Sequence, residues 1–224
     1  MPSSCAPGLP SAAEIASTPR ANTNLELLAL RFSSGVVAEQ AIYDRIVRDV
    51  AAIDAQAPEL ADITYSALAD GRTWDLGAGP TVLAEMEQGT YHDWDCLNQT
   101  YVVKNISFTM SFNQPLAKLE LKGIYDFDKV GAQYGALRGV ETVLPETNSG
   151  SGSTICLTLD GATWHYVFDR GSGDCPAGCI THVYTHFSTN AAGAVTALGQ
   201  IMQGSDSPYI SPAACTPAIK FDIK

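Results

Sequence analysis

The segment Thr163–Phe187 constrains this chain more than any other, because it predicts a long β-hairpin whose connecting loop carries two cysteines. Side chains that alternate with a period of two lie on opposite faces of a strand. The first strand of the hairpin is therefore expected to place one set on a single face: His165, Val167 and Asp169. The second strand places another set on one face: His182, Tyr184 and His186.

Three of the four histidines of the chain belong to this hairpin: His165, His182 and His186. His182 and His186 are about 13 Å apart along an extended strand. Both can bind the same ion only if the strand is bent or bulged, whereas one of them can bind an ion together with His165 on the facing strand. Imidazoles of this kind are suited to zinc or copper, and Asp169 or water would complete the ligand set. The alternative is a polar sheet face whose histidines make ordinary hydrogen bonds.

Six cysteines are spread over the chain without a CxxC pair: Cys5, Cys96, Cys156, Cys175, Cys179 and Cys215. This even number and wide spacing indicate three disulfides in an oxidising compartment rather than a zinc ribbon. Cys175 and Cys179 are close enough to bridge, Cys5 with Cys215 would join the termini, and Cys96 with Cys156 remains. Other connectivities stay open. A secreted or periplasmic protein is expected.

The composition is that of a globular, acidic chain, with 46% hydrophobic and 17% charged residues and a net charge of -11. Nucleic acid is an unfavourable partner, because binding to phosphates depends on clustered Lys and Arg side chains. No apolar run reaches the 18 or so residues of a membrane span. The expected partner is therefore a protein or a small molecule.

The first half of the chain predicts a sequence of short elements. Residues 1–24, rich in Ser, Ala, Pro and Thr, are expected to form an N-terminal spacer. The apolar run Leu25–Phe32 predicts a buried strand. The following elements are a helix over Val37–Asp54 with Arg45 and Asp49 on its solvated side, a strand over Ile63–Leu68, a glycine-rich loop over Gly71–Gly79, a helix over Pro80–Gln88, and a helix start at Tyr91–Cys96.

Alternating hydrophobicity over Val102–Phe112 predicts a half-buried strand that places Ile106, Phe108, Met110 and Phe112 on its inner face. A second strand over Leu116–Ile124, a helix capped by Asp126 and a strand over Val140–Pro145 follow. The fold class predicted for residues 25–146 is α+β, a ferredoxin-like split βαβ sheet with an insertion.

The segment Gly123–Glu146, with the run Leu-Arg-Gly-Val-Glu-Thr-Val-Leu-Pro near its end, resembles the last helix and strand of the inhibitor-type propeptides of subtilisin-like proteases. The resemblance covers about two dozen residues. It implies a ferredoxin-like fold and a protease as partner.

Residues 154–224 predict a C-terminal antiparallel β-meander held by disulfides and packed as one unit with the preceding part. Its loop Gly-Asp-Cys-Pro-Ala-Gly-Cys resembles a hairpin of secreted bacterial proteins of unassigned role. This resemblance implies a secreted protein and does not indicate an activity.

No G-x-S-x-G elbow or comparable catalytic motif occurs, so the sequence assigns no reaction. The leading hypothesis is a secreted binding module of unknown ligand, with a protease-inhibitor or propeptide-like role as one version. The alternative is a small extracellular metal-binding protein or metalloenzyme that uses the three hairpin histidines.

Overall fold

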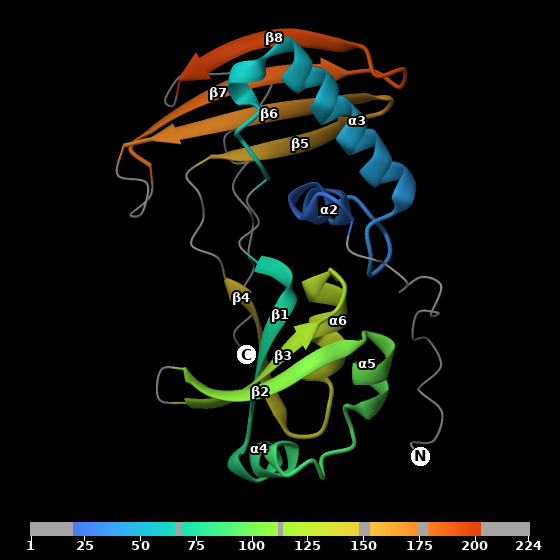
Figure 1. Ribbon diagram of the computed structural model, residues 1–224, viewed down its shortest axis with the longest axis vertical. Coiled ribbons are helices and arrows are strands. Elements are labelled where there is room, and N and C mark those ends of the chain that lie inside the picture. Colours follow the sequence, from blue (N-terminus) through green and yellow to red (C-terminus); the bar gives the residue numbers. More distant parts are fainter. Residues whose placement is uncertain (1–19, 66–68, 112–113, 148–152, 174–178, 203–224) are drawn as a thin grey trace. The chain divides into compact units, whose positions relative to one another are not determined.

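The computed structural model describes residues 20–65, 69–111, 114–147, 153–173 and 179–202, and the chain has mixed α and β structure with two antiparallel four-stranded sheets (Figure 1). It divides into two compact units. One comprises Met1–Glu39 and Ala69–Thr147, and the other comprises Gln40–Leu68 and Asn148–Lys224. No helix within the described residues has the length and hydrophobicity that crossing a bilayer requires.

The apolar run near the N-terminus is a helix, so the prediction of a buried strand there is wrong. Helix α2 spans Thr23–Leu30, and the Asn22 side chain caps it by accepting a hydrogen bond from the Leu25 N–H at 3.0 Å. A continuous apolar run does not distinguish a buried strand from a short buried helix. Of the predicted spacer, residues 1–19 lie outside the described residues.

The first sheet consists of β1 (Ala69–Ala78), β2 (Val103–Ser111), β3 (Gln114–Leu121) and β4 (Val140–Thr147). Its strand order is β2-β3-β1-β4, and every neighbouring pair is antiparallel. The predicted glycine-rich loop over Gly71–Gly79 is wrong, because residues 71–78 belong to β1 and Gly79 caps the following helix. The strand predicted over Ile63–Leu68 is not found at residues 63–65, and residues 66–68 lie outside the described part.

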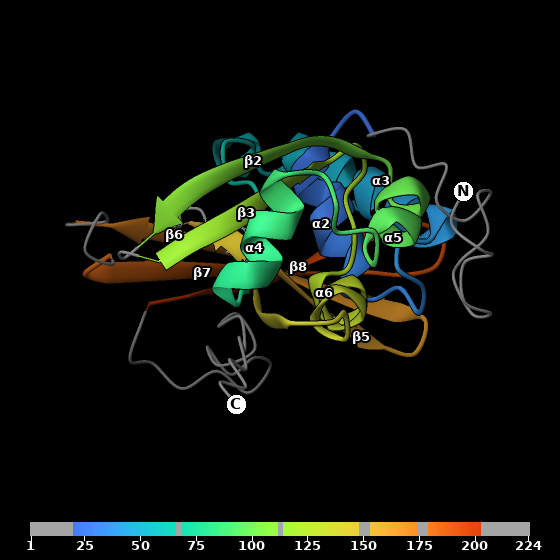
Figure 2. The ribbon, with the colours of Figure 1, turned by 90° about the horizontal axis from the view of Figure 1, so that it is seen from below.

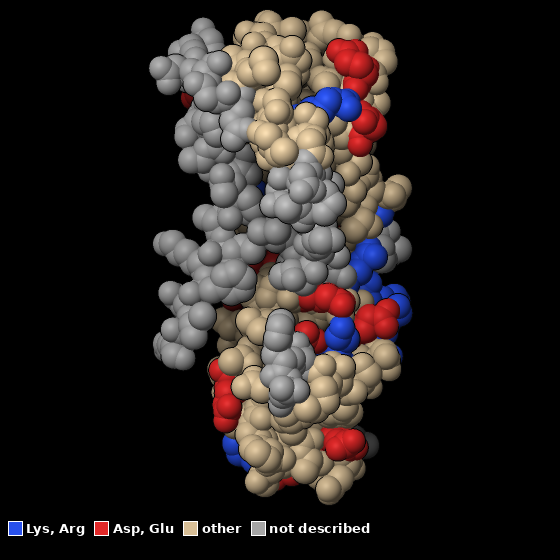
Figure 3. Space-filling view, turned by 90° about the vertical axis from the view of Figure 1, so that its left-hand side faces the viewer, with Lys and Arg blue, Asp and Glu red and all other residues tan. Residues whose placement is uncertain are grey.

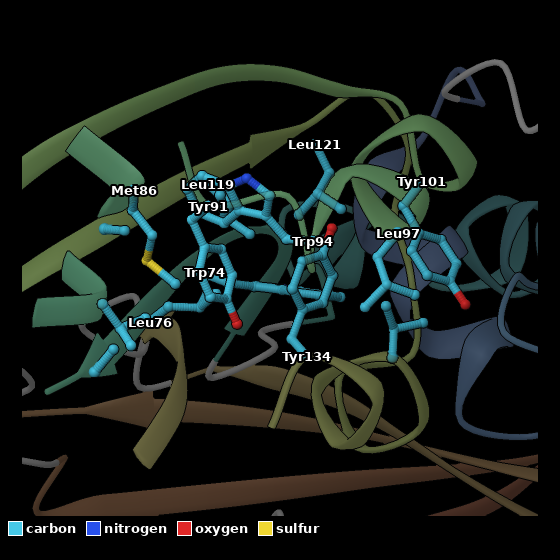
Figure 4. Close-up of a cluster of buried hydrophobic side chains, with 14 of the residues drawn as sticks. Trp74, Leu76, Met86, Tyr91, Trp94, Leu97, Tyr101, Leu119, Leu121 and Tyr134 are labelled. Atoms are coloured by element: carbon cyan, nitrogen blue, oxygen red, sulfur yellow. The ribbon is translucent and has the colours of Figure 1, made fainter. Parts of the chain in front are cut away.

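Three helices cover one face of this sheet: α4 (Pro80–Glu87), α5 (Asp95–Thr100) and α6 (Phe127–Gly135). Asp126 caps α6 as predicted, accepting from the Lys129 N–H at 3.1 Å. The core between helices and sheet is rich in aromatic side chains (Figure 4). Trp74 of β1 lies at its centre, fully buried and edge-to-face with Phe127 and Tyr134 of α6.

Val102 joins α5 to β2 with a strained backbone. Its φ angle is 50°, the one positive value at a non-glycine residue in the described part of the chain. Its side chain is 44% exposed, so little packing depends on it. A β-branched residue in the left-handed region is unfavourable because its Cβ crowds the backbone.

Replacing Val102 by glycine should stabilise the protein by about 1 kcal/mol, because relief of the strain exceeds the entropic cost of glycine and little packing is lost. Thr109→Gly is the control, since Thr109 is an exposed β2 residue without a positive φ. It should destabilise by about 0.5–1 kcal/mol. Chemical denaturation of both variants measures these changes, and an unstable Val102→Gly variant would contradict the strain argument.

The second unit contains α3 (Gln40–Gln56), the short 3-10 helix η1 (Pro58–Leu60) and a meander of β5 (Thr154–Asp160), β6 (Thr163–Ser172), β7 (Thr181–Thr189) and β8 (Val195–Met202). The sheet order β5-β6-β7-β8 follows the chain, which confirms the predicted antiparallel meander. The helix predicted over Val37–Asp54 is confirmed as α3, with Ile46, Val50 and Ile53 on its buried face.

Asp49 of α3 is fully buried, so the prediction that it lies on the solvated side of the helix is wrong. Its Oδ1 accepts hydrogen bonds from Arg48 at 2.8 and 3.0 Å. Its Oδ2 accepts from the Thr189 hydroxyl at 2.6 Å and the Tyr166 hydroxyl at 3.2 Å, with the Arg45 Nε at 3.4 Å. One carboxylate therefore connects α3 to β6 and β7.

Substitution of Asp49 by alanine should lower the free energy of unfolding by about 3–5 kcal/mol, because it leaves buried donors and a cation without their partner. Asp44→Ala is the matched control, since Asp44 lies on the same helix and is exposed. We expect its effect to stay within about 0.5 kcal/mol. Urea unfolding followed by circular dichroism checks both values, and equal effects would contradict a role for the buried carboxylate.

Candidate functional site

The two faces of the second sheet have different chemistry. Trp164, Tyr166 and Phe168 of β6 form the face against α3, where the Tyr166 hydroxyl meets Asp49 and the Arg45 guanidinium lies 3.9 Å above the Trp164 ring. The register pairs Val167 with His186. Residues on the opposite face follow from the register and the period of two: Thr154, Cys156 and Thr158 of β5, His165, Val167 and Asp169 of β6, and His182, Tyr184, His186 and Ser188 of β7.

His182 and Asp169 form a hydrogen-bonded pair on this histidine face, with 2.8 Å between Nδ1 and Oδ1. They are diagonal neighbours, since Asp169 lies opposite Tyr184 and His182 opposite Gly171. Burial raises the pKa of Asp169, and the hydrogen bond from His182 opposes that increase. The ring of Tyr184 stacks on the His182 ring at a centroid distance of 6.0 Å. A carboxylate partner holds the proton on Nδ1 and leaves Nε2 as the acceptor or ligand atom.

His165 and His186 form the second pair, with 3.3 Å between His165 Nδ1 and His186 Nε2. This pair is diagonal as well, because His165 lies opposite Ser188. Burial, and then the neighbouring His165, lower the pKa of His186 from 6.5 to about 4. The imidazole of His186 is therefore uncharged at neutral pH.

The strand register thus separates the three predicted metal ligands. His186 and His182 are four residues apart on β7, and each is bonded to a different residue of β6. Within the described residues, no three His, Cys, Asp or Glu side chains come together in a group that could hold a metal ion. Of the predicted cysteines, Cys96, Cys156 and Cys179 are described and none is free. Cys5, Cys175 and Cys215 lie outside the described residues.

The second candidate surface lies on the hairpin of β2 and β3, which run side by side in Figure 2. Only Ala117–Glu120 of β3 pair with β1, so the distal part of the hairpin is a two-stranded arm. Met110 lies on this arm and is 63% exposed, and Phe108 lies at its base, opposite Ala117, and is 39% exposed. The prediction of inward positions is therefore wrong for these two residues. The alternating pattern was correct, but it does not reveal how far the covering helices extend.

Strand β2 is also at the edge of its sheet, and no described strand pairs with its outer side. Exposed edges are usually protected by charged residues or proline. The segment 105–111, Asn-Ile-Ser-Phe-Thr-Met-Ser, contains neither. This lack of protection is the sequence signal that could have identified the arm.

Charged side chains of both signs lie close together on part of the described surface, although the whole chain has a net charge of -11. On the face shown in Figure 3, Lys and Arg side chains lie beside Asp and Glu side chains. In the first unit, Arg138 binds Glu85 at 2.6 Å and Asp93 at 2.8 Å.

Comparison with protein-family models, with curated proteins and with solved structures finds no match for this chain.

Lowering the pH from 7 to 5 should reduce the stability of the protein through His186. Its pKa is about 4 in the folded state and near 6.5 when unfolded, so the unfolded state binds more protons between these values and stability rises with pH across that interval. His186→Gln removes this contribution. Denaturant unfolding at both pH values, in the presence of a chelator, should show a smaller pH dependence for the variant than for the wild type. Equal dependence would show that His186 is not held uncharged.

Proposed function

We propose that this protein is a secreted binding module that takes up an extended segment of a partner protein along β2. The observation that carries this proposal is the edge of β2, which no described strand covers and which has no charged residue or proline over residues 105–111, beside the exposed Phe108 and Met110. Such an edge provides main-chain hydrogen bonds for affinity, and alternate side chains provide specificity.

The pairing register of β2 with β3 indicates which N–H and C=O groups of β2 point toward the open edge. Pro115 lies opposite Met110 and has no N–H to donate, as expected for a pair that exchanges no hydrogen bonds. Hydrogen-bonded and non-hydrogen-bonded pairs alternate along an antiparallel ladder. The N–H and C=O groups of Ile106, Phe108 and Met110 are therefore expected to face the open edge, on the strand positions whose side chains are apolar.

The topology of the first unit supports a ferredoxin-like split βαβ fold. Helices α4 and α5 connect β1 to β2, a hairpin leads to β3, and α6 connects to β4, within the antiparallel order β2-β3-β1-β4. The residues that resemble inhibitor-type propeptides, Gly123–Glu146, contain α6 and much of β4. A subtilisin-like protease is accordingly one candidate partner.

A secreted or periplasmic location with three disulfides is part of the same proposal. It is supported by the spacing of the six cysteines and by the absence of a free cysteine among the described residues. Titration of the denatured, unreduced chain with a thiol reagent is the simple check, and free thiols would count against it.

A metalloenzyme that uses all three histidines is the second candidate, and it has less support. His182 is engaged with Asp169 at 2.8 Å, whereas His165 and His186 contact each other. The geometry favours a site with two histidines over a site with three.

The proposed function predicts that Met110→Lys weakens partner binding at least tenfold, because a charge would be placed where apolar side chains meet. Two probes are used: a display library of linear peptides, and a subtilisin-like protease with a blocked active site. Thr109→Lys is the matched control, because it adds the same charge to the same arm on the opposite face. Its affinity should remain within about twofold of the wild type, a free-energy change well under 1 kcal/mol.

Amide hydrogen exchange locates the bound segment. Binding should slow exchange at Ile106, Phe108 and Met110, while Ser107 and Thr109, whose amides are expected to face β3, should change little. Failure of both probes to bind, or binding that leaves exchange in β2 unchanged, would overturn the proposal.

A further inference from the structure

We propose that His165 and His186 form a binding site for a divalent transition metal, with zinc favoured, on the histidine face of the second sheet. This site is independent of the peptide-binding edge proposed above. It uses two of the three hairpin histidines and excludes the third.

The distance between the two nitrogen atoms supports tetrahedral coordination. Two imidazole nitrogens bound at about 2.0–2.1 Å to a tetrahedral ion are about 3.3 Å apart, whereas adjacent ligands of a square-planar ion are about 2.9 Å apart. His165 Nδ1 and His186 Nε2 are separated by 3.3 Å. The pair thus matches one edge of the coordination tetrahedron that zinc prefers.

The orientation of the rings agrees with the same arrangement. Their centroids are 5.4 Å apart and their planes are inclined by 49°, so the rings do not stack. Two imidazoles that point at a shared tetrahedral ion have centroids about 5.2 Å apart, given the metal–nitrogen distance above. Water or ligand oxygens would occupy the two remaining positions of the tetrahedron, one more than in catalytic zinc sites, which have three protein ligands.

The surroundings hold these side chains ready for a metal. His186 is 8% exposed and lies in a strand that is paired on both sides, so its position is defined before an ion binds.

His182 provides an internal control. It is a diagonal neighbour of Asp169, not of His165, and the rise of a strand separates it from His186 by about 13 Å along β7. A two-histidine site therefore predicts that His182 has no influence on binding. A site formed by all three histidines predicts the opposite.

Isothermal titration of the full-length, tag-free protein with zinc chloride tests the proposal. We expect one zinc ion per chain, with affinity reduced at least tenfold in His165→Ala and in His186→Gln. His182→Ala and His92→Ala should bind within twofold of the wild type, since His92 lies in the other unit beside Asp95. Absence of zinc binding, binding unchanged in the first two variants, or binding lost in His182→Ala would overturn it.

Nitrogen NMR of the wild-type histidines keeps the test decisive if a variant fails to fold. Zinc should shift the Nδ1 resonance of His165 and the Nε2 resonance of His186 and leave His182 unchanged. Cobalt used in place of zinc should give the strong visible absorption of a tetrahedral centre. Shifts confined to other histidines, or the weak absorption of an octahedral ion, would count against the site.

Discussion

The buried carboxylate of Asp49 determines how the second unit is arranged. It joins α3 to β6 and β7 by accepting hydrogen bonds from Tyr166 and Thr189, while Arg45 and Arg48 balance its charge. Burial also raises the pKa of Tyr166, so its hydroxyl keeps the proton that it donates. Because side chains alternate along β6, a Tyr166 that points to α3 requires its neighbours His165 and Val167 to point away. The position of the histidine face thus follows from the position of one carboxylate.

In the first unit, the extent of the covering helices determines which apolar side chains of the sheet are buried and which are exposed. Side chains of α4, α5 and α6 bury the central part of one sheet face around Trp74. The distal part of the β2–β3 hairpin continues beyond its pairing with β1. Met110 is exposed on this part, and Phe108 is exposed at its base, opposite Ala117, whereas both would be core residues under a helix. A partner protein and a metal ion would accordingly use surfaces formed by different sheets, one through main-chain groups and apolar side chains, the other through imidazole nitrogens.

Elements with a clear period or cap were predictable from the sequence. The spacing of Ile46, Val50 and Ile53 indicated α3, Asp126 indicated the start of α6, and the alternation in Thr163–Asp169 indicated β6. The errors arose where a local pattern fits two structures. The apolar run Leu25–Phe32 suits a buried helix as well as a strand. The glycines of β1 suggested a loop, whereas Trp74, Asp75 and Leu76 between them pair with β3 on one side and β4 on the other.

The sequence by itself determined that the chain mixes α and β structure, that its last four described strands form a meander, and which side chains share a strand face with each histidine, because these depend on local periodicity. Only the tertiary structure decided which histidines meet. Register between β6 and β7 joins His165 to His186 and His182 to Asp169, and a register is set by long-range packing as well as by the turn. The same holds for Asp49, whose i,i+4 pairing with Arg45 is visible in the sequence, while its burial requires Tyr166 and Thr189, more than a hundred residues away.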